Sequence, residues 1–198
     1  EWNIDWDMGD GYSYQNSYEV NHIYEDNGLY QVVIYAYNDD TSVEASFEIY
    51  VKNIPPTIMN LMFDELINEG DISSFNILYD DVLSDEVKVT WTFPDGSIVD
   101  SSFAQYTFTD DGEFVVVVTA SDEDGGESSE QIMITVQNIA PVFTEIVMPS
   151  TGQKGETLDF SIGASDPGDD TITYTFDFGD GTSSLITIDG GNVTHKFT

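Results

Sequence analysis

The stretch Phe176-Asp177-Phe178-Gly179-Asp180-Gly181 has two relatives earlier in the chain, Trp6-Asp7-Met8-Gly9-Asp10-Gly11 and Trp91-Thr92-Phe93-Pro94-Asp95-Gly96. Their Asp-Gly pairs stand 85 residues apart (95 − 10 = 85; 180 − 95 = 85). The stretch Asn53-Ile54-Pro55-Pro56 returns at the same interval as Asn138-Ile139-Ala140-Pro141. A long and constant period indicates tandem copies of one small domain.

The two Asn-x-x-Pro stretches divide the chain into three parts. Residues 54–138 span one whole repeat and predict a complete domain. Residues 1–53 begin at the aromatic-Asp motif, so they predict the C-terminal part of a domain, and residues 139–198 predict the N-terminal part of a third. We therefore expect the sequence to be an excerpt from a longer tandem array.

The middle repeat has the alternation of β-strands. In 73–79, Phe75, Ile77 and Tyr79 fall on one face, as in a half-buried strand. Further strands are predicted at 87–93, 112–120 and 131–136, and no segment has the period of a helix. Several short strands in about 85 residues predict an all-β chain of tandem immunoglobulin-like antiparallel β-sandwiches. The aromatic residue that opens each motif, Trp91 in the middle repeat, is the predicted centre of the core.

The composition is that of a globular chain with an extreme charge. The 198 residues are 40% hydrophobic, but 38 acidic residues face four lysines and no arginine, for a formal net charge of −34. This excludes nucleic acid as a partner, because binding it requires Lys and Arg to neutralise phosphates. Such a chain needs cations, either bound calcium or salt that screens the repulsion. Cysteine is absent, which excludes disulfides and thiolate metal sites, and no stretch approaches the roughly 18 apolar residues of a membrane span.

Together these motifs resemble the polycystic kidney disease (PKD) domain family, whose pattern is aromatic-Asp-Phe-Gly-Asp-Gly, then Thr-His-x-Tyr, then Gly-x-Tyr-x-Val. The third repeat has the first motif at 176–181 and the second at 193–197. The first repeat has them at 6–11 and 22–24, and the third motif at 28–38. The second repeat departs from the pattern, with Thr92 for the Asp and Pro94 for the first Gly.

The resemblance implies an extracellular, non-catalytic module. Similar arrays occur in archaeal surface-layer proteins and beside secreted proteases, collagenases and chitinases, so the fold alone does not select the role. The leading interpretation is a spacer or assembly repeat of a microbial cell-surface layer, filament or adhesin. Its partners would be neighbouring repeats or other copies of the protein. The alternative is a carbohydrate- or protein-binding accessory domain of a secreted hydrolase.

Calcium is the sharpest chemical hypothesis, because Ca²⁺ takes six to eight oxygens from Asp, Glu, Asn and carbonyl groups. The resemblance adds that some PKD domains carry calcium at a Ser-Asp-x-x-x-Asp loop, here residues 165–170, and that Asn-x-x-Pro junctions of cadherin-like domains are stiffened by it. The candidate ligands lie after strands or in the linkers. They are Asn38, Asp40, Asn53, Asp81, Asp85, Asp122, Asp124, Asn138, Asp166 and Asp170.

An alternative explanation needs no ion. Asp and Gly are good turn formers, and Asp side chains cap their own backbone. In a chain this acidic, carboxylates also fall near one another by composition alone. Both interpretations stay open from the sequence.

Catalysis is not expected. His22 and His195 occupy the family's structural Thr-His-x-Tyr position, where the imidazole is expected to bond a neighbouring loop, and the second repeat offers Gln105 or Tyr106 instead. The paired carboxylates Asp7 and Asp10 suggest acid and base chemistry, but Thr92 breaks the pair in the second repeat.

Two surface features remain as hypotheses. The sequon Asn192-Val193-Thr194 makes Asn192 a candidate for glycosylation. Tyr35 and Tyr37 alternate with core positions, so they should point outward and either bind polysaccharide or reflect ordinary β propensity.

Overall fold

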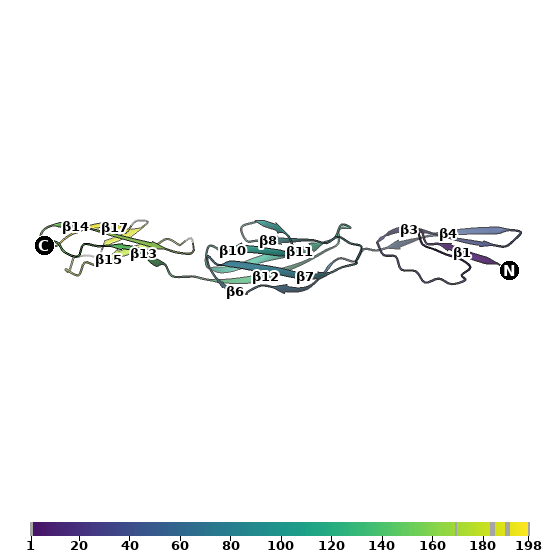
Figure 1. Ribbon diagram of the computed structural model, residues 1–198, viewed down its shortest axis with the longest axis horizontal. Coiled ribbons are helices and arrows are strands. Elements are labelled where there is room, and N and C mark those ends of the chain that lie inside the picture. The colour runs from purple at the N-terminus through teal and green to yellow at the C-terminus, as the bar shows by residue number, and fades with distance from the viewer. Residues whose placement is uncertain (1, 169, 183–184, 189–190, 198) are drawn as a thin grey trace.

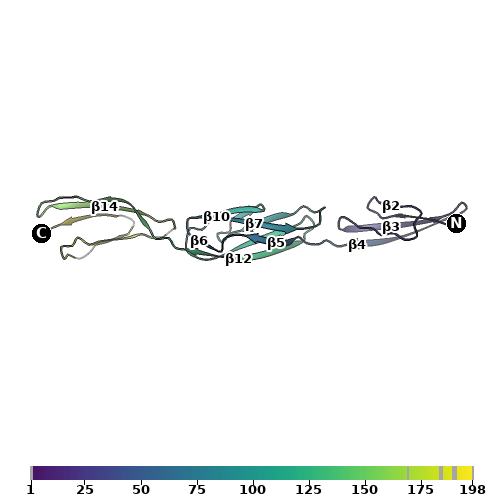
Figure 2. The same ribbon diagram turned by 60° about the horizontal axis from the view of Figure 1, so that its bottom comes forward.

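The computed structural model describes residues 2–168, 170–182, 185–188 and 191–197, and within these ranges the chain forms strands and no helix. The strands gather into three units that follow one another along the long axis, with the two termini at opposite ends (Figure 1). We call them the N-terminal unit (β1–β4), the middle unit (β5–β12) and the C-terminal unit (β13–β17). The turned view in Figure 2 shows the same row of three bodies.

The N-terminal unit is one four-stranded sheet in the order β2-β1-β3-β4. All its pairs are antiparallel, and β3 and β4 form a long hairpin that pairs Gly28 with Val51. The strands are β1 (Asn3–Asp7), β2 (Ser13–Tyr14), β3 (Gly28–Tyr37) and β4 (Ser42–Val51).

The middle unit is a two-sheet sandwich. Its first sheet has the order β10-β7-β5 and its second β6-β12-β11-β8-β9, with β6 parallel to the end of β12. The first sheet contains β5 (Thr57–Met62), β7 (Ile72–Asp80) and β10 (Phe103–Thr107). The second contains β6 (Leu66–Asn68), β8 (Lys88–Thr92), β9 (Ile98–Asp100), β11 (Gly112–Ser121) and β12 (Glu127–Gln137).

The core lies between these two sheets. Phe75 and Ile77 project into it from β7 and Trp91 from β8, and Trp91 is completely buried. The predicted strands at 73–79, 87–93, 112–120 and 131–136 correspond to β7, β8, β11 and β12. The predictions of an all-β immunoglobulin-like fold and of a core centred on Trp91 are confirmed.

The C-terminal unit has two small sheets. One has the order β13-β14-β17, and the other pairs β15 with β16. Its strands are β13 (Val142–Val147), β14 (Thr157–Ser165), β15 (Thr173–Phe176), β16 (Leu185–Ile188) and β17 (Gly191–Lys196).

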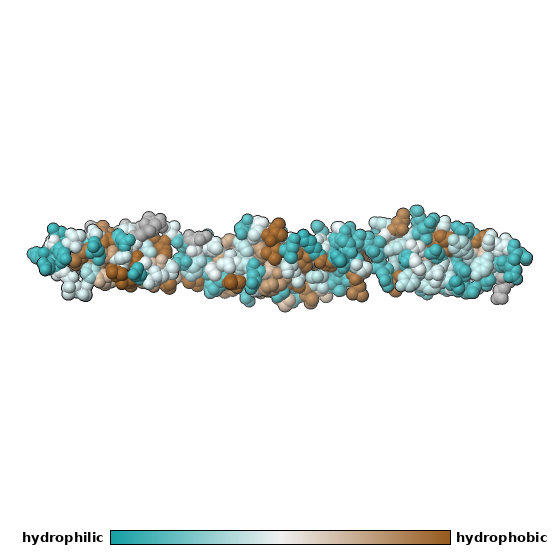
Figure 3. Space-filling view, turned by 45° about the horizontal axis from the view of Figure 1, so that its top comes forward, coloured by the Kyte–Doolittle hydropathy of each residue, from teal (hydrophilic) through white to brown (hydrophobic). Residues whose placement is uncertain are grey.

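Hydrophilic residues cover much of the face of the whole molecule that Figure 3 shows, with scattered hydrophobic residues between them.

Candidate functional site: the two junctions between units

The first junction lies where the linker at Asn53 leads from β4 to β5. The N-terminal unit contributes the loop before β3, and the middle unit contributes the loop after β7 and the turn between β11 and β12. β7 and β11 both end at this side of the sandwich, so their following loops meet here. Ser84 Oγ donates a hydrogen bond of 2.6 Å to the carbonyl of Glu25, which joins the two units directly.

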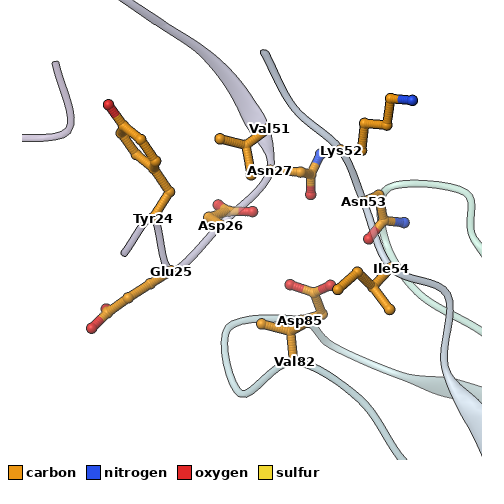
Figure 4. Close-up of a pocket in the computed structure, with 10 residues that line it drawn as sticks. All are labelled: Tyr24, Glu25, Asp26, Asn27, Val51, Lys52, Asn53, Ile54, Val82 and Asp85. Atoms are coloured by element: carbon orange, nitrogen blue, oxygen red, sulfur yellow. The ribbon is translucent and has the colours of Figure 1, made fainter. Parts of the chain in front are cut away.

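Carboxylates from separate loops converge at this junction. One carboxylate oxygen from each of Asp81, Asp85 and Asp122 lies within 4.8 Å of the others, and the same holds for Asp26, Asp85 and Asp124. In Figure 4 the oxygens of Asp26, Asn27, Asn53 and Asp85 face a common space, whereas the Lys52 ammonium points away from it. The second group takes Asp26 from the N-terminal unit and the other two from the middle unit, so it spans the junction.

Hydrogen bonds hold Asp122 in place. Asn53 Nδ2 donates to Asp122 Oδ2 (2.8 Å), and the backbone N–H groups of Asp124 (3.0 Å) and Gly126 (2.7 Å) donate to Oδ1. The Asn53 bond is the main cause that lowers the pKa of Asp122, with burial opposing it and the backbone donors adding to it. Asp122 is therefore a fixed anion close to Asp81 and Asp85.

Three oxygens at the first junction are buried and have no hydrogen-bond partner among the described residues. They belong to Asn27 (Oδ1), Asn53 (Oδ1) and Asp81 (Oδ2). Buried polar atoms are normally satisfied, and oxygen is the ligand that a hard cation such as Ca²⁺ takes. The arrangement therefore has the chemistry of a cation site.

The second junction lies at the linker containing Asn138, and here too the linker asparagine bonds a carboxylate. Asn138 Nδ2 donates to Asp170 Oδ2 (3.0 Å), which stands after β14 as Asp85 stands after β7, whereas Asn53 bonds Asp122 after β11. Carboxylate oxygens of Asp166, Asp170 and Glu69 lie within 4.8 Å of one another. Glu69 also forms such a group with Asp110 and Asp111, which stand before β11. Asp169 lies outside the described residues.

Two of the predicted ligands lie elsewhere. Asn38 and Asp40 stand in the turn between β3 and β4, far from both junctions (Figure 1). Asn38 Oδ1 accepts the N–H groups of Asp40 and Thr41, each at 2.9 Å. These two residues thus form a side-chain-capped turn, and neither belongs to a carboxylate group found among the described residues.

The histidines fasten the Asp-Gly turns to a neighbouring segment. His22 Nε2 lies 2.6 Å from Asp10 Oδ2, and His195 Nε2 lies 2.8 Å from Asp180 Oδ2. The expectation that the imidazole bonds a neighbouring loop is confirmed. The middle unit has no histidine at this place. There, burial followed by the charge of the nearby Asp95 raises the pKa of Tyr106, so Tyr106 is the side chain that lies by the turn.

The sequence profile of the PKD domain family matches residues 53–136 and 138–198, and a second PKD domain profile matches residues 1–51. The chain belongs to the PKD domain family. The predicted resemblance is therefore confirmed over nearly the whole sequence.

Individual proteins and solved structures are similar to parts of the chain. Collagenase ColA of Clostridium perfringens is 29% identical over 135 residues, which is 67% of this chain and 12% of that protein. The PKD domain of an M14-like peptidase from Thermoplasmatales archaeon SCGC AB-540-F20 is 22% identical, with a TM-score of 0.38 over 43% of this chain and 98% of that one. The I67–I69 fragment of titin is 17% identical, with a TM-score of 0.40 over 93% and 70%.

The PKD turns explain the paired carboxylates without catalysis. Asp7 Oδ1 accepts the N–H of Gly9 (3.0 Å), and Asp177 Oδ1 accepts that of Gly179 (2.9 Å). The second Asp of each pair bonds the backbone two residues on and holds the histidine. Both carboxylates of a pair are thus engaged in the turn itself.

Besides Asn27, four acidic residues at the PKD junctions were missed from the sequence: Asp26, Glu69, Asp110 and Asp111. Three of them carried a signal, because the pairs 26–27 and 110–111 both directly precede the glycine that opens the long strand, Gly28 or Gly112. Glu69 carried none, because the position 85 residues later is Lys154. Glu69 meets Asp166 and Asp170 only through the contact between the middle and C-terminal units.

The remaining surface predictions concern Asn192 on β17 and two tyrosines on β3. Asn192 is exposed on β17, an edge strand of its sheet. Tyr35 is 42% exposed, whereas Tyr37 is half-buried and donates its hydroxyl to Asp5 Oδ2 (3.2 Å). Glycosylation of Asn192 stays a prediction. Among the described residues there is no helix long and apolar enough to span a membrane.

Proposed function

We propose that this chain is a non-catalytic, extracellular structural module, a tandem PKD spacer of a microbial cell-surface layer, filament or adhesin. The observation that carries the proposal is the hydrogen bonding at the two junctions, where residues of one unit bond the next unit or the linker. Ser84 reaches Glu25 across the first junction, and Asn138 bonds Asp170 at the second. A chain whose units are held end to end keeps the distance and direction between its two ends fixed, and this is the function of a spacer.

Calcium at the first junction is part of this proposal. Asp81, Asp85 and Asp122 converge within 4.8 Å, and like charges so close repel each other strongly unless a cation lies between them. Asp26 brings the preceding unit within reach of the same group. A bound Ca²⁺ would therefore favour the straight arrangement over bent ones.

The alternative function is that of an accessory module in a secreted hydrolase, binding polysaccharide or protein. The likeness to Collagenase ColA supports it, since the matched region is a small part of that protein. Exposed aromatic side chains of the N-terminal unit, including Tyr18 and Tyr35, offer stacking surfaces for sugars. In either role the chain holds or binds other molecules and does not catalyse a reaction.

Small-angle X-ray scattering of the 198-residue chain tests the spacer proposal. We expect the profile of one elongated rod with a narrow distribution of lengths in millimolar CaCl₂. A broad ensemble of bent shapes under the same conditions would contradict a spacer held by its junctions. Specific retention of the chain on insoluble collagen or polysaccharide, with the rod absent, would favour the accessory module.

A further inference from the structure

The C-terminal unit has an end that corresponds to the end by which the middle unit contacts its neighbour. β14 (Thr157–Ser165) ends beside the second junction, because Asp166 follows it directly. The turn before β14, residues 153–156, therefore lies at the opposite end of the unit. Lys196 lies there too, since it pairs with the first residue of β14, and Phe197 follows it. We call these residues the outer end of the C-terminal unit.

The outer end has the same backbone as the end of the middle unit at the second junction. Gly155 donates its N–H to the carbonyl of Phe197 (3.0 Å). Gly70 donates in the same way to the carbonyl of Phe108 (2.8 Å). Both glycines have a positive φ, 81° and 77°, which favours glycine. The residue before each glycine therefore occupies the same corner of the same turn.

At this corner the middle unit has Glu69 and the C-terminal unit has Lys154. Glu69 is 1% exposed, and its Oε1 accepts the N–H of Ile139 in the linker to the next unit (2.7 Å). A β-carbon on Gly70 would stand 2.8 Å from Pro167 Cβ, so the next unit lies directly against the turn. In the middle unit this corner is thus an interface between two PKD units.

The corresponding corner of the C-terminal unit is exposed and basic. Lys154 and Lys196, half of the four lysines of the chain, are both exposed here. A β-carbon on Gly155 would have only Lys196 Cε near it among the described residues, at 3.9 Å. The ion pairs found in the described part of the chain use Lys88 and the two histidines, so neither lysine of the outer end is engaged in one. The carboxylate of Glu156 in the same turn is bonded to the turn's own backbone.

The opposite end of the rod is acidic. The turn between β3 and β4 lies there (Figure 1), and its Asp39 and Asp40 are exposed. β3 and β4 correspond to β11 and β12, because Val51 and Val136, which pair with the opening glycines, stand 85 residues apart (136 − 51 = 85). The turn between β11 and β12 faces the preceding unit at the first junction. The two ends of the rod therefore correspond to the two sides of a junction, and they carry opposite charges.

We propose that copies of this chain associate head to tail, with Lys154 and Lys196 of one copy against the Asp39–Asp40 turn of the next. Opposite charges across an interface set the orientation of the partner and speed the encounter. A contact between two different surfaces at opposite ends of a rod does not close on itself, so it produces open filaments. This inference rests on the proposed spacer function and adds to it the way in which one rod meets the next.

Salt should act on this association in two directions. The net charge of −34 on each copy opposes association at low ionic strength. At about 0.15 M salt the Debye length is about 8 Å, so distant parts of two copies no longer repel each other strongly while charges in contact still attract. At about 1 M salt, where it is about 3 Å, the contact is weakened as well. We expect association to be strongest at intermediate salt.

Carbodiimide cross-linking of the 198-residue chain tests the contact, because it joins a lysine amine directly to a carboxylate. Copies labelled with ¹⁴N and ¹⁵N are mixed in about 0.15 M NaCl, so that mass spectrometry distinguishes cross-links between copies from those within one. We expect Lys154 or Lys196 to be joined to Asp39 or Asp40 of another copy. Sedimentation velocity of the untreated chain should show species longer than one copy, in a proportion that rises with concentration.

Lys154→Glu gives the turn the residue of the middle unit and should weaken the association at least about fivefold. This is the upper effect of one exposed ion pair, and the variant also replaces an attraction by a repulsion. Lys88→Glu is the matched control. It changes the net charge by the same amount at an exposed position of β8 and should leave the association unchanged.

A charge-swapped chain separates loss of the contact from damage to the turn. With Lys154→Glu, Lys196→Glu, Asp39→Lys and Asp40→Lys together, association and its salt dependence should return. A monomer at every salt concentration, cross-links with no preference for the Asp39–Asp40 turn, or equal association of Lys154→Glu and Lys88→Glu would overturn the inference. So would a charge-swapped chain that stays monomeric. A rod in scattering without association would leave the spacer function standing and refute only the contact between copies.

Discussion

At the scale of the residue, one aromatic side chain organises each PKD unit. Trp91 packs against Phe75, with ring centroids 5.6 Å apart, and its indole N–H donates to the carbonyl of Ser101 (3.0 Å). Trp6 makes the same bond to Ser17 in the N-terminal unit (2.9 Å). The third unit has Phe176 at the same position of the repeat, and its side chain has no N–H to donate. The three units therefore share an aromatic side chain at this position, and only the two with Trp add a hydrogen bond.

Trp91→Ala should destabilise the middle unit by about 3 to 5 kcal/mol, because it leaves a large cavity in a closely packed core. Trp91→Phe should cost less, since it keeps much of the volume and loses one hydrogen bond of about 1 kcal/mol. Urea unfolding followed by circular dichroism measures both. Trp2→Ala, at an exposed position, is the control and should change stability by no more than about 0.5 kcal/mol. Equal effects of Trp91→Ala and Trp2→Ala would contradict the assignment of the core.

At the scale of the element, the Asp-Gly turn is fastened to a distant segment through its second carboxylate. In the C-terminal unit Asp180 accepts hydrogen bonds from Thr182 (N–H 3.1 Å, Oγ1 2.6 Å) and lies against His195 on β17. The His195 ring stacks on Phe178 with centroids 3.9 Å apart. The turn, its aromatic residue and β17 are therefore one connected unit.

The Asp180 contacts predict a pH dependence. The Thr182 and His195 bonds lower the pKa of Asp180 from 3.8 to about 2. Because the folded-state pKa lies below the unfolded one, the stabilisation is complete above about pH 4 and is lost as the pH falls toward 2. NMR titration of the Asp180 carboxyl carbon should give this midpoint, and Asp180→Asn should remove the corresponding pH dependence of unfolding. Asp159→Asn, at an exposed position on β14, should not; a midpoint near 3.8 would refute the contact.

At the scale of the whole molecule, charge and elongation act together. A net charge of −34 is spread over three units in a row. The groups of three close carboxylates found among the described residues lie where the units meet. Repulsion across the junctions opposes docking of the units. Screening by salt and binding of cations both favour docking, but only a bound ion acts at micromolar to millimolar concentration.

Thermal unfolding of the 198-residue chain in EDTA, CaCl₂ and matched NaCl separates these two effects. For a site with a dissociation constant of about 0.1 mM, about 10 mM calcium should add about 2.7 kcal/mol to the folded state. The unfolding midpoint should therefore rise more in CaCl₂ than in NaCl of equal ionic strength. If about 1 M NaCl, where the Debye length is about 3 Å, reproduces the whole gain, the acidity is an adaptation to saline surroundings and the calcium proposal fails.

Much of the first junction was predictable from the order of strands. Asp81 and Asp85 follow β7 and Asp122 follows β11. Both strands end at the side where the linker enters, so the local sequence already placed these carboxylates together. The histidine contact was predictable in kind, since Gly-Asp-Gly and Thr-His recur as a pair. The choice of Tyr106 over Gln105 was not, because it depends on which side chain of β10 faces the turn.

The sequence by itself determined the period, the alternating strands, the aromatic core and the oxygen-rich loops, because each follows from short-range pattern and turn chemistry. The tertiary structure alone decided which of those loops meet. It placed Asn38 and Asp40 in a turn remote from both junctions and buried Glu69 against the next unit. The physical reason is that each junction is formed by two separately folded bodies. The contact between them is set by shape, since a β-carbon on Gly70 would stand 2.8 Å from Pro167 Cβ and one on Gly168 would stand 2.5 Å from Glu69 Oε2. No spacing along the chain encodes this contact.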